Sequence, residues 1–587
     1  ITAANADGDG KTDIVIANID GDNVDILRNN SPGIGVLPPP VIESFTPVKA
    51  TPGTLITISG KNFSTDTAKN AVFFGTVKGK MLTATGTQLQ LESPIGIGFK
   101  QLSVLNKTTN LSASSQFQFS TNFNGKSSIN ASDFAPAVRY YSNRELYSFA
   151  FGDLDVDGKL DIVSVIRDNI AISKNISSKG KLSTSSFAPS VEFIGPEIYG
   201  KPAIADIDGD GKPEILVIKN NNISIFRNIA TKGVINASSF ATRIDVKGFS
   251  GSILVEDMDN DGKPDIISFF NDQIRVFRNS CTLGNITAAG FTQVASLSRY
   301  ATTNGGYTIV DIDGDGKKDI VVGFSLSIYQ NITKPGGAVE FKLVDFPGVP
   351  RTNYNAVADL NGDGKMDIVS TNPTQLVILY GEAQKGNILP SAFSIDRSVV
   401  YPFTSFYGLY PNIIDINGDG KLDILLGNTI FKNNGTAPPS KATINIPSNS
   451  YIREIGDLDG DGAPEIGFEE TTSNGIGILK NNLILTPTTL AEQINTIPKT
   501  AKVGYELTVY PNPTNTGIGF VLDNYNGKDI NVLLTNLNGK TIHTENFKMI
   551  STSAYYKLGI SKTLGAGIYI LKLTGSGLTE SRKVVVQ

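Results

Sequence analysis

The sequence lacks most of the side chains on which catalysis and covalent stabilisation depend. Its 587 residues include one cysteine, Cys281, one histidine, His543, and no tryptophan. A single cysteine excludes disulfides within the chain. Nucleophilic triads and zinc centres draw on several histidines or cysteines, so neither is expected. No run of about 18 or more apolar residues occurs, so no membrane-spanning helix is expected.

What the sequence has in excess is an acidic nonapeptide, Asp-x-Asp-x-Asp-Gly-x-x-Asp, followed by an aliphatic residue. Its eight copies begin at Asn5, Asp153, Asp206, Asp257, Asp311, Asp359, Asp415 and Asp457. Side chains at alternate positions of a tight turn converge on one point, as in the first half of an EF-hand loop, and calcium takes about six to eight oxygen ligands. Glycines such as Gly314 and Gly316 permit the positive φ angles that this turn requires.

Each copy is therefore expected to hold one calcium ion, up to eight in all. The ligands would be the side chains at positions 1, 3, 5 and 9 of the nonapeptide and the backbone carbonyl at position 7. They are Asn5, Asp7, Asp9, Lys11, Asp13, Asp153, Asp155, Asp157, Lys159, Asp161, Asp206, Asp208, Asp210, Lys212, Glu214, Asp257, Asp259, Asp261, Lys263, Asp265, Asp311, Asp313, Asp315, Lys317, Asp319, Asp359, Asn361, Asp363, Lys365, Asp367, Asp415, Asn417, Asp419, Lys421, Asp423, Asp457, Asp459, Asp461, Ala463 and Glu465. A metal-free, solvated turn is the alternative, but carboxylates at this density repel one another unless a cation neutralises them.

From Asp153 onward the copies recur every 42 to 56 residues, the length of one four-stranded propeller blade. In the first of these units, one strand enters the acidic loop (147–154), a second leaves it (162–166), and a third ends in Lys-Asn (170–175). A polar turn then leads to a fourth strand that opens with Ser-Phe-Ala. The strands are β-branched and largely unalternated, as expected for strands buried on both faces. The sequence predicts an all-β protein.

These units resemble the FG-GAP/VCBS repeats of integrin-α-type β-propellers. The resemblance implies a propeller over residues 123–485, with calcium in the loop between the first and second strands of each blade. Seven blades are expected if the early Asp133-Phe134-Ala135 strand completes the last unit, which has no Ser-Phe-Ala strand of its own. An eight-bladed ring with the next domain inserted into its first blade is the alternative. Residues 1–30 are expected to be a partial blade, the end of an upstream repeat.

Residues 38–121 follow a different pattern, in which alternating strands and Gly/Asn turns indicate a small β-sandwich. The Ser-Phe-Thr-Pro element at 44–47 and the Gly-Lys-Asn-Phe element at 60–63 resemble those of an IPT/TIG domain, an immunoglobulin-like module. The resemblance implies a spacer or a binding surface beside the propeller.

Residues 486–504 are expected to be a linker, and residues 505–587 again indicate a small antiparallel sandwich. The ordered elements Val-Tyr-Pro-Asn-Pro (509–513), Leu-Asn-Gly-Lys (537–540) and Gly-Ala-Gly-Ile-Tyr (565–569) resemble the C-terminal type A sorting domain of the Bacteroidetes type IX secretion system. This implies export through the periplasm and outer membrane, with the outer-membrane secretion machinery and its shuttle β-barrel as partners. The product would be secreted or attached to the cell surface. One more adhesive β-sandwich is the alternative.

The expected function is that of an adhesin-like binding protein, whose calcium-stabilised propeller presents its loops to a glycan or a surface protein. No catalytic residue, no cofactor besides calcium and no nucleic-acid partner is expected. The alternative is a calcium-dependent polysaccharide lyase or glycosidase, because two carboxylates suffice for glycoside hydrolysis. A mainly structural surface component is a third possibility. Aromatic residues before the loops are candidates for a ligand platform: Tyr140, Tyr141, Tyr199, Tyr300, Tyr307, Tyr354, Tyr401, Phe406, Tyr407 and Tyr410.

Overall fold

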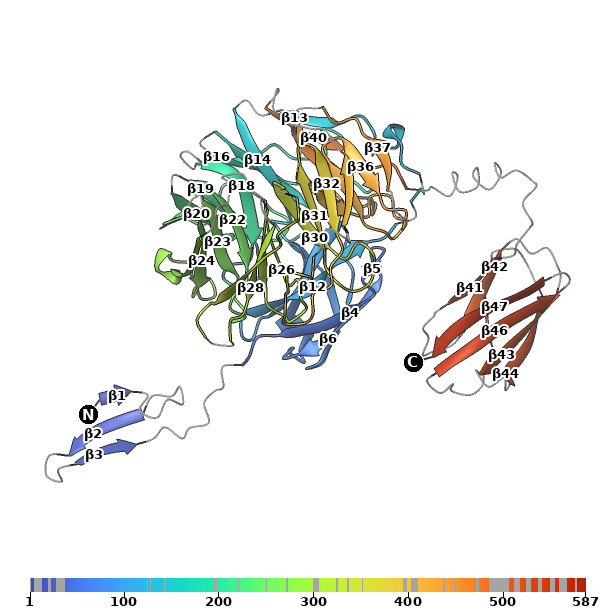
Figure 1. Ribbon diagram of the computed structural model, residues 1–587, viewed down its shortest axis with the longest axis horizontal. Coiled ribbons are helices and arrows are strands. Elements are labelled where there is room, and N and C mark those ends of the chain that lie inside the picture. Colours follow the sequence, from blue (N-terminus) through green and yellow to red (C-terminus); the bar gives the residue numbers. More distant parts are fainter. Residues whose placement is uncertain are drawn as a thin grey trace. The chain divides into compact units, whose positions relative to one another are not determined.

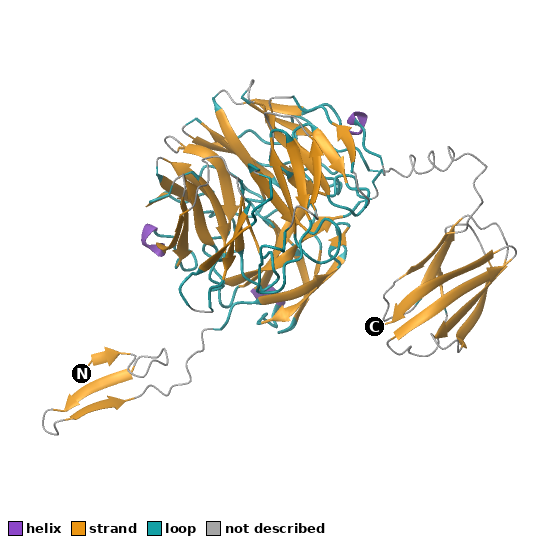
Figure 2. Ribbon diagram, viewed as in Figure 1, coloured by secondary structure: helices purple, strands orange, loops and turns teal. Residues whose placement is uncertain are grey.

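A computed structural model shows a protein built of strands joined by loops (Figures 1 and 2). It describes residues 2–4, 13–18, 23–27, 37–484 and 506–586, apart from gaps in the last two ranges. The gaps are 124, 127, 142–143, 168, 195–197, 220, 250, 271–272, 299–305, 324–325, 335–336, 351, 394–397, 403–409, 436–438, 448–449, 471–473, 511–517, 524–528, 537–540, 549–554, 559–566 and 576–577. Helical structure in the described residues consists of the 3-10 turns η1 (Thr67–Lys69), η2 (Ala131–Asp133) and η3 (Ala288–Gly290). None of these is long or apolar enough to cross a membrane.

The chain divides into two compact units, residues 1–485 and 486–587. The first unit contains the acidic repeats and the segment before them. The finer domain boundaries expected from the sequence stay predictions.

Seven four-stranded antiparallel sheets lie within described residues 138–479, and we number them sheets 1 to 7. Sheet 1 is β14 (Leu146–Gly152), β15 (Asp161–Ile166), β16 (Asn169–Ser173) and β17 (Val191–Ile194). Sheet 2 is β18 (Ile198–Ala205), β19 (Glu214–Lys219), β20 (Asn222–Phe226) and β21 (Ile244–Lys247). Sheet 3 is β22 (Ser252–Glu256), β23 (Asp265–Phe270), β24 (Gln273–Asn279) and β25 (Phe291–Ser298).

Sheet 4 is β26 (Tyr307–Val310), β27 (Asp319–Val322), β28 (Ser327–Asn331) and β29 (Phe341–Asp345). Sheet 5 is β30 (Tyr354–Ala358), β31 (Asp367–Asn372), β32 (Gln375–Leu379) and β33 (Ser398–Pro402). Sheet 6 is β34 (Asn412–Ile414), β35 (Asp423–Leu426), β36 (Thr429–Lys432) and β37 (Ser440–Thr443). Each sheet follows the order of the chain, so the unit read from the sequence is one sheet. The seven-bladed ring stays a prediction.

Sheet 7 joins the start of the repeat region to its end. It consists of β38 (Ser450–Gly456), β39 (Glu465–Glu470) and β40 (Gly475–Leu479), with β13 (Val138–Tyr141) as its outer strand. β13 pairs antiparallel with β40, with Val138 opposite Ile478, and Phe134 bridges to Asn481. This is the pairing expected from the early strand at 133–135. The first strand of this repeat, β38, also contacts β14 of sheet 1, so the last sheet lies beside the first.

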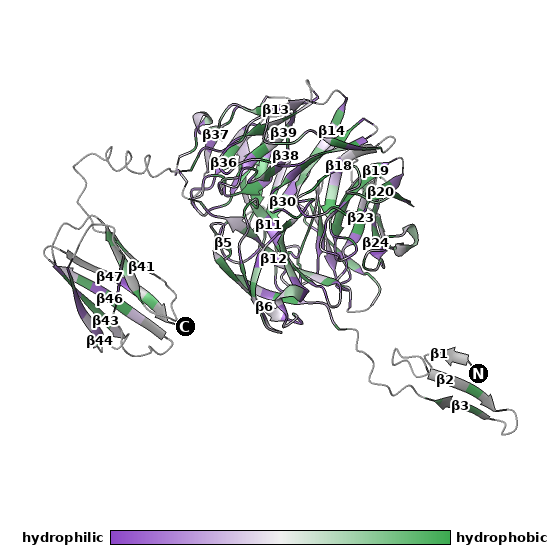
Figure 3. Cartoon of the chain, turned by 180° about the vertical axis from the view of Figure 1, so that it is seen from behind, coloured by the Kyte–Doolittle hydropathy of each residue, from purple (hydrophilic) through white to green (hydrophobic). Residues whose placement is uncertain are grey.

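The cores lie between neighbouring sheets. Between sheets 1 and 2, for example, Val163 and Val165 pack with Ile215 and Val217, and all four side chains are fully buried. Each of these strands contributes to the core on both of its sides, so hydrophobic residues run along it without alternation (Figure 3). This explains the β-branched runs of the sequence.

Residues 37–121 form a β-sandwich of two sheets. One contains β4 (Val41–Thr46), β6 (Leu55–Lys61), β10 (Gln88–Glu92) and β9 (Lys80–Ala84), and the other contains β5 (Lys49–Ala50), β12 (Leu111–Thr121), β11 (Phe99–Asn106), β7 (Asn70–Phe74) and β8 (Val77–Lys78). The core between them includes Ile56, Ile58, Leu89 and an edge-to-face pair of Phe74 and Phe119.

The chain ends contain smaller sheets. β1 (Thr2–Ala4), β2 (Asp13–Asn18) and β3 (Asn23–Leu27) form one three-stranded sheet. The second unit has two sheets. One contains β41 (Glu506–Tyr510), β42 (Gly519–Asp523) and β45 (Tyr555–Lys557), and the other contains β44 (Thr541–Lys548), β43 (Asp529–Asn536), β46 (Gly567–Gly575) and β47 (Leu578–Val586). Their core contains Phe520, Leu534 and Leu571. The expected linker at 486–504 and the elements at 511–513 and 537–540 lie outside the described residues.

Candidate metal loops and ligand face

The acidic loops connect the first and second strands of sheets 1 to 7, and position 9 is the first residue of each second strand. In sheet 1, Asp153 Oδ1 and Oδ2 accept hydrogen bonds from the backbone N–H groups of Asp157 and Gly158, both at 3.0 Å. Asp161 Oδ2 accepts from Leu154 N at 3.1 Å. The loop's own amides thus fold its carboxylates inward, and Gly158 has φ of 97° as the turn requires.

Five loops bring acidic side chains together closely enough to share an ion. In each, three carboxylate oxygens lie within 4.8 Å of one another. The clusters among the described residues are Asp153, Asp155, Asp161; Asp206, Asp208, Asp210; Asp257, Asp259, Asp265; Asp311, Asp313, Asp315; and Asp457, Asp459, Glu465. The loops at Asp359 and Asp415, which carry asparagine at position 3, form the same turn without such a cluster. The copy at Asn5 lies outside the described residues up to Asp13, which begins β2.

The chemistry of these loops fits a hard cation, because every side-chain donor is an oxygen. Burial and the neighbouring carboxylates raise the pKa of Asp153 and of Asp206 to about 7. Asp257 Oδ1 is buried and accepts no hydrogen bond from the described residues. Buried carboxylates that lack a neutralising partner are costly, and a divalent ion would remove that cost.

The third strand brings a cation to most loops. Lys480 Nζ contacts Asp459 and lies 2.8 Å from Asp461 Oδ2, and Arg227 Nε lies 2.8 Å from Asp208 Oδ2. Similar ion pairs join Lys174 to Asp155 and Asp157, Arg278 to Asp259, and Lys432 to Asp419. The sequence shows these residues as the basic half of the recurring Arg/Lys-Asn dipeptide, but its spacing alone does not assign them a partner.

The asparagine of the same dipeptide joins neighbouring sheets. Asn228 Nδ2 donates to the carbonyl of Pro213 in its own sheet at 2.9 Å and to the carbonyl of Leu154 in sheet 1 at 2.8 Å. The corresponding inter-sheet bonds are Asn175 to Leu458, Asn279 to Ile207, Asn331 to Met258, Asn433 to Leu360, and Asn481 to Ile416. We call these six asparagines the inter-sheet clamps. Five of these amides are buried, Asn433 is partly buried, and each amide donates a hydrogen bond to a neighbouring sheet.

Three family models match the chain. The FG-GAP-like repeat matches residues 153–217, 206–268, 257–322, 359–426 and 415–468, the IPT/TIG domain matches 40–121, and the secretion system C-terminal sorting domain matches 508–587. The chain contains FG-GAP-like repeats, a TIG domain and a secretion system C-terminal sorting domain. The sorting domain directs export by the type IX secretion system, to the cell surface or the medium. None of the three matched families is an enzyme family.

No curated protein matches the chain. Among solved structures, a protein of unknown function from Bacteroides thetaiotaomicron is 16% identical, with 77% of this chain and 99% of that chain covered and a TM-score of 0.30. An auxiliary nutrient binding protein from Bacteroides ovatus is 13% identical, with 76% and 99% covered and a TM-score of 0.30. An Agrocybe aegerita lectin that recognises terminal N-acetylglucosamine is 17% identical, with 45% and 72% covered and a TM-score of 0.31.

The TIG domain lies on the loop side of the FG-GAP propeller. Thr76 Oγ1 accepts a hydrogen bond from Asp153 N at 3.0 Å, and Ser112 N donates to the carbonyl of Gly262 at 2.7 Å. Gly96 N donates to Asp457 Oδ2 at 3.3 Å, so the TIG backbone contacts an expected metal ligand. The sequence predicted this domain beside the propeller with the loops presented outward, whereas these loops are covered.

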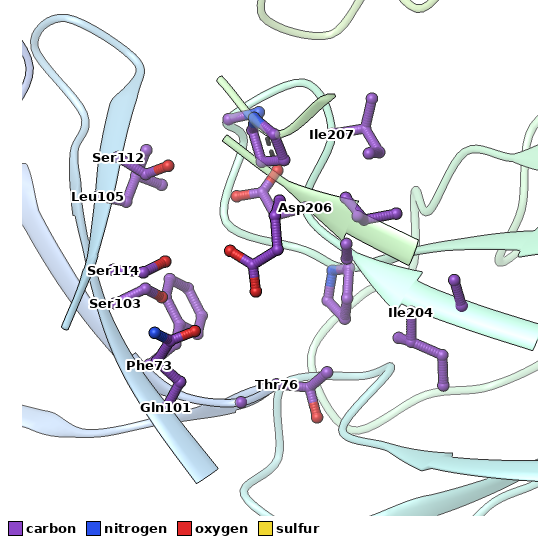
Figure 4. A pocket seen from close by; sticks show the side chains of 18 of the residues that line it. Phe73, Thr76, Gln101, Ser103, Leu105, Ser112, Ser114, Ile204, Asp206 and Ile207 are labelled. Atoms are coloured by element: carbon purple, nitrogen blue, oxygen red, sulfur yellow. Dashed lines mark hydrogen bonds between the residues drawn. The ribbon is translucent and has the colours of Figure 1, made fainter. Parts of the chain in front are cut away.

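A cavity of about 540 Å³ separates the TIG domain from sheets 1 to 3. Figure 4 shows Ser103, Ser112 and Ser114 of the TIG domain on one side, and Ile204 and Asp206 of sheet 2 on the other. The TIG domain and sheets 1 to 3 line this cavity together.

Two of the predicted platform tyrosines lie at or just before the start of the first strand of their sheets, at the end away from the loops. Tyr354 is the first residue of β30, and Tyr410 precedes β34 by two residues. Their ring centroids are 3.9 Å apart. Tyr451, near the start of β38, belongs to the same group, and the guanidinium of Arg453 lies 5.0 Å from its ring centroid. Burial raises the pKa of the Tyr354 phenol; of these two neighbours, Tyr451 raises it further and Arg453 lowers it. Tyr451 was not among the aromatic residues predicted from the sequence, although it precedes the loop at Asp457 much as Tyr354 precedes the loop at Asp359.

The other predicted platform residues have different positions. Tyr140 donates from its hydroxyl to the carbonyl of Ser183 at 2.6 Å, Tyr307 stacks on Phe269, and Tyr401 packs near Phe431. Tyr141 is 64% exposed at the outer edge of sheet 7. Tyr199 lies in β18 but its side chain is outside the described residues, as are Tyr300, Phe406 and Tyr407.

Nucleophilic chemistry would depend on Cys281 and His543, and the surroundings of neither residue favour it. Cys281 is buried, and burial raises the pKa of its thiol. His543 lies in β44 of the second unit, where Nε2 is 3.0 Å from Glu545 Oε2.

Proposed function

We propose that this exported protein is a calcium-loaded propeller that binds a glycan on the face opposite the TIG domain. The observation that carries the proposal is the cluster of Tyr354, Tyr410, Tyr451 and Arg453, which lies at the starting ends of inner strands in three consecutive sheets. The TIG domain contacts the loops of sheets 1, 3 and 7, whereas these side chains lie at the strand ends away from the loops, which supports that end as the ligand face.

Calcium supports the ring in this proposal. The forty oxygen ligands predicted from the sequence would hold the calcium ions. Five of the loops would do so through the carboxylate clusters described above. Bound calcium supplies the positive charge that the buried carboxylates require. The loop residues also stabilise the turn between the first and second strands. The side chain at position 9 bonds to the end of the third strand; for example, Asn175 N donates to Asp161 Oδ1 at 2.8 Å.

The tyrosine cluster suits a sugar. Aromatic rings stack on the C–H faces of pyranoses, while guanidinium and carboxylate groups bond their hydroxyls. Arg453 is held by Glu469 at 2.7 Å, which fixes both groups beside Tyr451. Tyr410 is 41% exposed and so remains available to a ligand. A surface protein ligand is an outcome that the test below would reveal.

Binding without turnover fits this cluster better than polysaccharide cleavage. A lyase needs a base, and Tyr354 is a candidate within this cluster. Half-burial raises the pKa of Tyr354, and its hydrogen-bonded contact with Tyr410 raises it further. A phenol with a raised pKa is a poor base at neutral pH.

A glycan array probed with the calcium-loaded protein tests the proposal. Tyr410→Ala and Tyr451→Ala should each weaken binding about fivefold or more, since one stacking contact contributes about 1 kcal/mol. Tyr141→Ala, an exposed tyrosine on the outer strand β13, is the control and should leave binding unchanged. New reducing or unsaturated ends in incubated polysaccharides would favour the enzyme alternative. Absence of glycan binding together with capture of a surface protein would contradict the glycan proposal.

A further inference from the structure

In three loops, the cation at the end of the third strand contacts the same two loop positions. Lys174 and Lys480 each contact the carboxylates at positions 3 and 5, and Arg227 reaches Asp208 and Asp210. In these loops the Oδ1 atom at each position accepts a loop amide, and the cation takes Oδ2. The cationic side chains are only 15–23% exposed, so water screens these pairs less than ordinary surface ion pairs.

The paired cations differ from one loop to the next. Loops with four carboxylates carry one paired cation, giving a formal charge of −3. In sheet 4, Gln330 occupies the third-strand position and bonds Asp313 Oδ2 at 2.8 Å, while Lys317 lies 2.8 Å from Asp315 Oδ2 and supplies the charge instead. In sheet 5, asparagine at position 3 leaves three carboxylates, and Tyr380 stands at the third-strand position.

The loops at Asp359 and Asp415 form a matched pair. Both have the ligand pattern Asp, Asn, Asp, carbonyl of Lys, Asp. The loop at Asp415 has Lys432 within 2.7 Å of Asp419 Oδ2, whereas no cation pairs with the carboxylates at Asp359 among the described residues. The formal charge is therefore −3 for the loop at Asp359 and −2 for the loop at Asp415.

We propose that these third-strand cations are internal counterions that stabilise the metal-free loops and lower their affinity for calcium. The inference rests on the proposed calcium binding. An ammonium or guanidinium group beside two ligand carboxylates attracts them in the absence of metal and repels a divalent ion that binds there. Removing the cation should therefore shift metal-free stability and metal affinity in opposite directions. Loss of a merely structural contact would lower both or leave affinity unchanged.

Terbium luminescence can report on one loop at a time, because the chain has no tryptophan. Lys212→Trp places a sensitiser at position 7 of the loop at Asp206, where the expected ligand is the backbone carbonyl. In that background, Arg227→Gln should raise terbium affinity about tenfold or more and lower the melting temperature of the metal-free protein. Arg227→Lys keeps the charge and is the matched control, expected to leave the affinity within a few-fold of the parent.

The matched pair provides a second test. With reporters Lys365→Trp and Lys421→Trp, the loop at Asp359 should bind terbium more tightly than the loop at Asp415. Lys432→Gln should bring the second loop toward the first. If Arg227→Gln fails to fold without metal, its affinity can be measured from the calcium-loaded protein by chelator competition.

The outcomes separate this inference from the proposed function. Terbium binding to none of the loops would overturn both. Binding with equal or weaker affinity after Arg227→Gln and Lys432→Gln would overturn the counterion role alone. Tighter binding in Arg227→Lys, equal to that in Arg227→Gln, would also contradict it, because charge would then not be the cause.

Discussion

The interface between sheets 1 and 2 and the interface between sheets 4 and 5 join neighbouring sheets in different ways. At the first, Asn228 bridges the two sheets through buried hydrogen bonds. At the second, Gly381 occupies the asparagine position, and no side chain of the described residues donates to the carbonyl of Ile312. Phe346 and Phe393 pack edge to face there instead, within a cluster that includes Met366. A buried amide and an apolar cluster thus serve as alternative ways of joining two sheets.

The glycine is required by its surroundings. A Cβ on Gly381 would lie 2.0 Å from the carbonyl oxygen of Met366 and 3.1 Å from the ring of Phe393. Gly381 N still donates to Asp367 Oδ1 at 2.9 Å, so the anchor to the acidic loop is kept while the clamp is lost. Sheet 5 also differs in its loop, which is exposed and has no TIG contact among those described above.

Removal of calcium should have the largest effect on both interfaces. Each ion bound at a hundred times its Kd contributes about 2.7 kcal/mol, and several loops act together. We expect chelation to lower the melting temperature by more than any single substitution below, as measured by calorimetry with and without chelator. An unchanged melting temperature would show that the loops do not depend on metal.

The pH dependence of the metal-free protein should be the next largest effect. Burial raises the pKa of Asp153, Asp206 and Asp457 to about 7, and of Asp311 and Asp367 to about 6, against about 3.9 in unfolded chains. Because the folded values are raised, the stability is present below pH about 4 and is lost as pH rises through 6 to 7. Melting temperatures of metal-depleted protein should therefore fall from pH 5 to pH 8. A rise over this range would contradict the burial of these carboxylates.

Asn228→Ala should destabilise the clamped interface by about 2–4 kcal/mol, because the carbonyls of Leu154 and Pro213 lose their donor in a buried site. Denaturant unfolding of the calcium-loaded protein measures this difference. Asn236→Ala, which removes an exposed turn asparagine, is the control and should cost much less. Equal effects of the two substitutions would mean that the clamp adds nothing to the ring.

Gly381→Asn should fail to create a clamp. By analogy with the other sheets, an asparagine at this position would be expected to stabilise the contact between sheets 4 and 5. The close approach of the Met366 carbonyl instead makes Gly381→Asn destabilising by about 1–3 kcal/mol. The same unfolding measurement tests this. A more stable variant would show that the backbone at this interface can shift to accept an asparagine.

The sequence predicted those parts of the molecule that depend on short spacing. The turn at Asp311 follows from residues within nine positions, and its Gly314 and Gly316 have φ of 75° and 90° as expected. It also predicted that the strand near Phe134 pairs with the last unit. The clamp from Asn175 to Leu458 and the contact of Gly96 with Asp457 were not predicted, because each joins residues hundreds of positions apart. Nothing in the local pattern indicates which carbonyl such an amide will meet.

The placement of the TIG domain bears on how the ring is assembled. Its Thr76 contacts the first sheet and its Gly96 contacts the last, and β13 pairs with a strand more than 300 residues later in the chain. Pairing over such distances is slow, since the intervening chain must first be ordered. A domain that is synthesised early and contacts both the first and the last sheet can therefore serve as a template that positions the two for pairing.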